Sequence, residues 1–165
     1  MEVWPQLKTL RVTIGLDSVM FHLKELIGRM PRLERLDFEP LEYDRAYLNA
    51  QEPWPVLPNL AYLNFDHREE AYAPLFLVIL NAAPNLHTVL VEGNWSPYKS
   101  SPAVQALRKH VGLKRVIWVC DDMKLGHLVD GAMSGVEEIV LQTYWLDETE
   151  EMIPDVSQAS LAQAD

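Results

Sequence analysis

The chain has 165 residues, enough for one domain that buries a core without disulfides or metals. It is 48% hydrophobic and 23% charged, a composition too apolar for a protein that is disordered as a whole. The formal net charge of −10 disfavours nucleic acid and anionic membrane surfaces as partners, because their phosphates would be repelled. One basic cluster is an exception, and it either contacts a phosphate or forms the solvated end of a helix. Its members are Arg108, Lys109, His110, Lys114 and Arg115.

The chain carries no recognisable targeting signal. Its first residues, MEVWPQLKTL, lack a basic flank followed by an apolar run, so no signal peptide is predicted. The most apolar stretch, Ala71 to Ala83, is too short to span a bilayer. Cys120 is the single cysteine, which excludes an intramolecular disulfide and suits a reducing compartment. We therefore expect a cytoplasmic or nuclear protein.

A repeated six-residue phrase divides the chain into six units, and apolar residues stand at its first, fourth and sixth positions. The first residues of successive phrases lie 26, 27, 26, 27 and 23 positions apart. The last two apolar positions alternate with variable residues, which is the period of a strand with one buried face. The six instances are Leu7-Leu10-Val12, Leu33-Leu36-Phe38, Leu60-Leu63-Phe65, Leu86-Val89-Val91, Leu113-Val116-Trp118 and Val136-Ile139-Leu141.

Proline stands two residues before the first leucine of the phrase in the first four units, as in Met30-Pro31-Arg32-Leu33. We expect this proline to end any preceding helix and to give an extended approach to the strand. Units five and six have Gly112 and Gly135 just before the phrase, and glycine interrupts a helix by another route.

Between the phrases the apolar pattern becomes helical. The first helix is predicted to run to Met30 after a cap at Asp17 or Ser18. The second connection, Leu41 to Val56, predicts only a short helix followed by a loop. That short helix is Tyr43 to Asn49, and the other predicted helices are Ala71 to Ala83, Ala103 to Val111 after Pro102, and Leu125 to Met133.

Strands and helices that alternate with a fixed period predict an α/β fold in which neighbouring strands are parallel. The predicted architecture is a solenoid with a curved parallel sheet of about six strands and helices on its convex side. The alternative is a doubly wound α/β domain. That alternative does not explain the recurring Pro-x-Leu-x-x-Leu phrase, and no glycine-rich phosphate-binding turn follows any predicted strand.

We divide the chain into a repeat domain, 1–146, and an acidic C-terminal tail, 147–165. Acidic and small polar residues dominate after Trp145, so the tail is expected to be flexible and to aid solubility. Alternatively, the tail covers the open edge after the sixth unit through Met152, Ile153 and Val156.

The phrases MPRLERLDF, LPNLAYLNF and APNLHTVLV resemble leucine-rich repeats, and the unit length is similar to that of F-box and ribonuclease-inhibitor-like proteins. The resemblance covers about residues 4 to 146. The family's Asn or Cys after the strand is largely missing, and only Asn94 is near such a place. The resemblance implies that the repeats bind a protein. In F-box proteins they capture the substrate of a ubiquitin ligase. Because the first unit begins near Trp4, without an F-box, we expect the substrate-binding end alone.

The residues between the buried strand positions are predicted to form a partner-binding surface, roughly 25 Å across six parallel strands. Units two to four supply acids and units four to six supply apolar residues, which suits a partner with Lys or Arg beside a hydrophobic anchor. Tyr62 is the strongest single anchor candidate. The predicted partner-binding residues are Arg35, Asp37, Glu39, Tyr62, Asn64, Asp66, Leu90, Glu92, Ile117 and Val119.

Simpler interpretations of this surface stay open. The acids are also consistent with an ordinary solvated face. The apolar group, which includes Val140, would disappear if the strand register slipped in units five and six, or if the tail covered it. Trp118 is large for an inward position, so the register of unit five is the weakest part of the pattern.

The sequence predicts no catalytic residues, no metal and no cofactor. None of the five histidines has zinc-ligand spacing, and no nucleophile elbow, phosphate-binding loop or dinucleotide motif occurs. Asp66-His67 and Asp121-Asp122 have metal-binding side chains but follow strands, where polar turn residues are common. The two aspartates after Cys120 disfavour a thiolate nucleophile. Two alternatives to substrate recognition for a ubiquitin ligase stay open. The first is a scaffold or sensor, and the less favoured second is a hydrolase or metal enzyme.

Overall fold

The structure is a computed structural model that describes residues 4–14, 18–40, 54–66, 73–92, 102–120, 135–146 and 152–155. These residues form seven strands and three helices, and together they make an α/β fold. The predicted helices near 43–49 and 125–133 lie outside the described residues. The helices are α1 (Ser18–Gly28), α2 (Ala73–Ala82) and α3 (Pro102–Lys109). The strands are β1 (Thr9–Ile14), β2 (Arg35–Pro40), β3 (Tyr62–Asp66), β4 (Thr88–Glu92), β5 (Arg115–Cys120), β6 (Glu138–Leu146) and β7 (Met152–Asp155).

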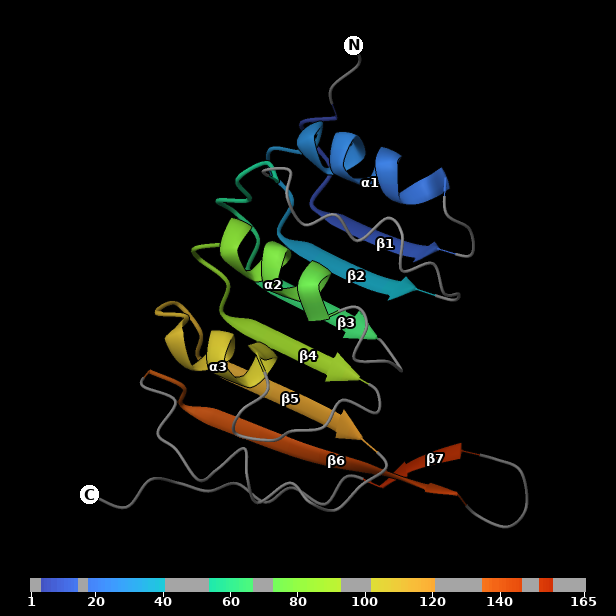
Figure 1. Ribbon diagram of the computed structural model, residues 1–165, viewed down its shortest axis with the longest axis vertical. Helices are drawn as coiled ribbons and strands as arrows, with labels where there is room; N and C mark the ends of the chain where they lie inside the picture. The colour runs from blue at the N-terminus through green and yellow to red at the C-terminus, as the bar shows by residue number, and fades with distance from the viewer. Residues whose placement is uncertain are drawn as a thin grey trace.

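The strands form one sheet in which the spatial order equals the order in the chain (Figure 1). Strands β1 to β6 are all parallel to their neighbours. A doubly wound sheet would reverse its strand order at one point, and this sheet has no reversal. The prediction of about six parallel strands is therefore confirmed.

The seventh strand, β7, runs antiparallel to the end of β6 and pairs with Thr143 to Leu146. It belongs to the acidic tail, for which we expected flexibility or, alternatively, contact with the edge of the sheet. For Met152–Asp155 the structure has the second arrangement.

The register repeats from strand to strand without a slip. Leu36 pairs with Leu63, and Leu63 pairs with Val89. In the fifth unit, Trp118 lies between Val91 and Leu141 in the register and is fully buried. The inward orientation of Trp118 is therefore confirmed. The same row holds Phe38 and Phe65 on β2 and β3 and the smaller Val91 on β4.

A tight turn precedes each of the strands β1 to β5. The backbone N–H of Leu33 donates to the carbonyl of Met30 at 3.0 Å, and Leu60 and Leu86 make the equivalent bonds at 3.2 Å. Each proline is thus the second residue of a four-residue turn, a position that its fixed φ suits. The prediction that Pro31 and its equivalents give an extended approach to the strand is wrong, because the chain reverses there within four residues.

The core lies between the sheet and the helices, which lie along one side of it (Figure 1). Apolar residues from all three helices join the inward side chains of the strands in one buried cluster. The Phe65 ring stacks on Phe38, with centroids 5.3 Å apart, and meets the edge of Phe76 from α2 at the same distance. Among the described residues, no helix lies on the other side of the sheet.

Candidate partner-binding face of the sheet

The strand face is the side of the sheet opposite the core. Along β3 and β4 the burial alternates between half-buried and buried residues, which places every second residue on this face. The register aligns these residues in three rows across β1 to β6. The first row is Thr9, Arg35, Tyr62, Thr88, Arg115 and Glu138; the middle row is Arg11, Asp37, Asn64, Leu90, Ile117 and Val140; the third row is Thr13, Glu39, Asp66, Glu92, Val119 and Gln142.

All ten predicted partner-binding residues lie on the strand face, in neighbouring positions of these rows. The acidic members come from β2 to β4 and the apolar members from β4 and β5, so the face has an acidic half and an apolar half. The two halves meet at β4, where Leu90 and Glu92 stand two residues apart.

Arg35, Asp37 and Tyr62 form a connected group in the acidic half. The Arg35 guanidinium donates two hydrogen bonds to the Asp37 carboxylate, at 2.8 and 2.9 Å. Its central carbon also lies 4.1 Å from the centroid of the Tyr62 ring on the neighbouring strand. The hydrogen bond to Asp37 raises the pKa of Arg35 above its ordinary value. Sequence analysis missed this contact, although the register places Arg35 opposite Tyr62.

The third row carries three carboxylates on three adjacent strands. Glu39 accepts a hydrogen bond of 3.3 Å from the Thr13 hydroxyl, and Asp66 pairs in register with Glu92. Neighbouring strands lie roughly 4.8 Å apart, so like charges in one row repel each other. A cation that approaches this row would reduce the repulsion.

The apolar half is less exposed than the sequence predicts. Leu90 and Ile117 are half-buried, but only 6% of Val119 and 9% of Val140 are exposed to solvent. The expectation that both valines are exposed is wrong. The register is unchanged, so a slip of the strands is not the reason for their burial.

Asn64 occupies the middle of the strand face, in register with Asp37 and Leu90. Its Oδ1 atom is shielded from solvent and has no hydrogen-bond partner among the described residues. A buried acceptor without a partner costs about 1–3 kcal/mol of stability. Asn64 lies on β3, next to the strand where the acidic and apolar halves meet.

The basic cluster predicted from the sequence is not one patch. Lys114 pairs with Glu137 at 2.7 Å and Arg115 with Glu138 at 2.9 Å, at the strand end of the cluster. Lys109 lies elsewhere, on the helical side of the molecule. These charges therefore do not converge on a single phosphate.

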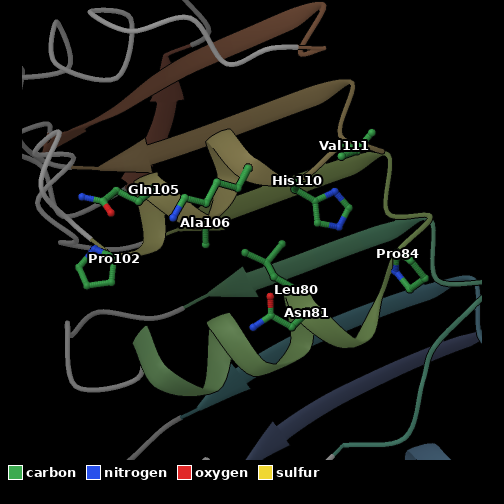
Figure 2. A pocket seen from close by; sticks show the side chains of 9 residues that line it. Leu80, Asn81, Pro84, Pro102, Gln105, Ala106, His110 and Val111 are labelled. Carbon is green, nitrogen blue, oxygen red and sulfur yellow. The ribbon is translucent and has the colours of Figure 1, made fainter.

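A groove of about 460 Å³ lies between α2 and α3 on the helical side (Figure 2). Leu80 and Gln105 contribute to its walls, and Lys109 and His110 line it at the C-terminal end of α3. The His110 Nε2 donates to the carbonyl of Ala83 at 2.9 Å, which fixes the ring. This end of the groove therefore combines the carbonyl oxygens of a helix C-terminus with the Lys109 cation.

Within the described ranges, no three His, Cys, Asp or Glu side chains come together as a metal site. Of the metal-binding residues considered from the sequence, His67, Asp121 and Asp122 lie outside those ranges. None of the described helices has the length and apolar character needed to cross a membrane.

Comparisons of the chain with models of protein families, with curated proteins and with solved structures gave no match. The function must therefore be argued from the geometry of the strand face itself.

Proposed function

We propose that this protein is a protein-interaction module that binds a protein or peptide partner on its strand face. The observation that carries the proposal is the set of three in-register rows on the side of the sheet that the helices leave open. Such a face presents many side chains at a fixed spacing, and adjacent rows differ in chemistry. A partner with several contact points can therefore be recognised without any catalytic group.

We propose further that the fold is a leucine-rich-repeat solenoid with helices on its convex side. The supporting features are the in-order parallel strands, the period of about 26 residues and the turn that precedes each of β1 to β5. Each unit then buries its apolar face only by stacking on the next unit.

The chemistry of the face favours a basic partner with an apolar anchor. Three carboxylates in the third row attract Lys or Arg, and the neighbouring Leu90 and Ile117 offer half-buried apolar contact. The net charge of −10 adds a long-range attraction for the same kind of partner.

Within this class, the leucine-rich phrases favour substrate recognition for an F-box-like ubiquitin ligase. A scaffold or sensor would use the same face. Binding of an F-box adaptor by the full gene product would separate the two, because only the ligase role requires it.

Selection from a random peptide display library tests the binding function. The proposal predicts enriched peptides in which Lys or Arg stands beside an apolar residue. Glu92→Lys should weaken their binding roughly tenfold, because it reverses one charge of the acidic row. Glu25→Lys is the matched control: it changes the net charge equally, but Glu25 lies exposed on α1 and pairs only loosely with Arg29, at 3.7 Å.

The melting temperatures of both variants should first be measured and should match that of wild type, because Glu92 also has contacts within the protein. Failure to enrich any peptide would contradict the proposal. So would peptides that bind wild type and Glu92→Lys equally well.

A further inference from the structure

The outer face of α2 is apolar. Among the ten residues of this helix, Asn81 is the only polar one and none is charged. The other described helices carry charged side chains away from the core, such as Lys24 and Glu25 on α1. A helix that is apolar all round is normally covered on every side. Leu77 and Val78 are nevertheless only half-buried, so the outer face of α2 has the composition of a surface that a partner covers.

The groove between α2 and α3 continues this apolar face (Figure 2). Leu77 stands one turn before Leu80 and Asn81, which line the groove, so it lies on the same side of α2. On the α3 side the lining includes the half-buried Ala106. Val111, at the end of the groove, is 90% exposed, the largest exposed fraction among the large apolar side chains that the structure describes. Apolar surface that extends over neighbouring elements in this way usually marks a contact site.

The shape of the groove suits a helix. The helices α2 and α3 run in the same direction on either side of it (Figure 1), and its lining extends along α3 from Pro102 to Val111. Since α3 has eight residues, the groove is roughly 12 Å long, or about two turns of a helix. A partner helix satisfies its own backbone hydrogen bonds, whereas an extended peptide against two helices would leave amide and carbonyl groups unpaired. The groove therefore favours a helix whose apolar residues recur every three to four positions.

The charges at one end of the groove select the direction of such a helix. Lys109 is exposed and forms no ion pair within the part of the chain that the structure describes, whereas Lys8 and Lys114 each pair with a glutamate at 2.7 Å. The C-terminal end of α3 places the partial negative charge of its carbonyl oxygens beside the Lys109 cation. The N-terminus of a partner helix with an acidic first turn complements both, because its amides carry partial positive charge and its carboxylate meets Lys109. A helix antiparallel to α3 brings its first turn to this end.

We infer that the groove between α2 and α3 binds an amphipathic helix of a partner protein, antiparallel to α3. Apolar residues of the partner helix pack against Leu77, Ala106 and Val111, and an Asp or Glu in its first turn pairs with Lys109. The site lies on the helical side of the molecule and takes an acidic segment, whereas the strand face takes a basic one. It can therefore fail without affecting the proposed function.

Selection with the full chain from a library of helices displayed on a stable helical scaffold tests this inference. The enriched helices should carry Asp or Glu in the first turn and one apolar stripe. Lys109→Glu should weaken their binding roughly tenfold, because its carboxylate repels that of the partner. Arg32→Glu is the matched control: it changes the net charge equally but lies at an exposed turn outside the groove, so binding should be unchanged. Glu92→Lys on the strand face should also leave the binding of these helices unchanged.

A second pair of variants tests the apolar part of the groove without disturbing the core. Val111→Ser should weaken the same helices roughly threefold, whereas Val56→Ser, at a 70% exposed position outside the groove, should not. Failure to enrich any helix, enrichment without a preference for an acidic first turn, or equal losses for Lys109→Glu and Arg32→Glu would overturn the inference. So would a mass above 18.9 kDa for the chain alone that Val111→Ser returns to 18.9 kDa, because the groove would then bind a second copy.

Discussion

The guanidinium of Arg35 lies over the ring of Tyr62, 4.1 Å from its centroid, and joins two adjacent parallel strands on the strand face. The same guanidinium is held in plane by its two hydrogen bonds to Asp37. Three side chains with different chemistry therefore act as one fixed group, and Tyr62 presents a supported ring to any partner on this face.

This group predicts that Arg35→Lys destabilises the protein although it conserves the charge. A lysine cannot make two parallel hydrogen bonds to Asp37 and stack on Tyr62 together. We expect a loss of about 0.5–1 kcal/mol in the free energy of unfolding, measured with urea. Arg32→Lys, at an exposed turn position, is the control and should change nothing. Equal effects of the two substitutions would contradict the account.

Asparagine side chains connect successive turns. The Asn59 Nδ2 donates to the Pro31 carbonyl and the Asn85 Nδ2 to the Pro58 carbonyl, both at 2.8 Å. Asn85→Ala should cost about 0.5–1.5 kcal/mol, because Pro58 then loses a partner. Asn81→Ala, at an exposed position on α2, should cause no loss, because alanine has the higher helix propensity. Chemical denaturation measures both values, and a larger loss for Asn81→Ala would refute the connecting role.

Gly112 allows the fifth turn to approach the fourth. A Cβ at this position would lie 2.9 Å from the Pro84 carbonyl oxygen and 3.3 Å from that of Leu86. Both atoms belong to the backbone, so Gly112→Ala should destabilise by about 1–3 kcal/mol. Gly28→Ala is the control: its Cβ would meet only the Pro55 side chain, at 3.9 Å. That variant should be neutral or slightly stabilising, as measured by thermal unfolding.

The Oδ1 atom of Asn64, which has no hydrogen-bond partner in the part of the chain that the structure describes, predicts a stabilising substitution. Asn64→Leu removes a buried polar atom and extends the apolar row of Leu90 and Ile117, so we expect a gain of about 1 kcal/mol. Asn64→Asp should destabilise, because it places a second carboxylate in register with Asp37. If Asn64→Leu instead lowers the midpoint of urea unfolding, Asn64 makes a contact that this account lacks.

The periodic part of the fold could be predicted from the sequence. Inward positions such as Leu36 and Leu63 recur at a nearly constant interval, and only parallel strands in chain order keep such residues in one row. The residues of the strand face follow directly, because they alternate with the inward ones. This is why the sequence placed Tyr62 and Glu92 on one face correctly.

What the sequence could not predict depends on neighbours that are distant in the chain. Val119 has the orientation that the alternation predicts but is buried, and its exposure depends on tertiary neighbours that the local pattern does not contain. The backbone at Pro31 was predicted to be extended, because the prediction used the restriction that proline places on the residue before it. The turn propensity of proline itself decides the structure there. The close approach at Gly112 requires the position of Pro84, 28 residues earlier in the chain, which no local pattern contains.

Methyl NMR of the labelled protein, titrated with a selected basic peptide, tests most directly whether the strand face is the docking surface. The account predicts that the methyl signals of Leu90 and Ile117 shift on peptide addition. Those of Leu80 and Val111, which line the groove on the helical side, should stay in place. Shifts confined to Leu80 and Val111, with Leu90 and Ile117 unchanged, would contradict it.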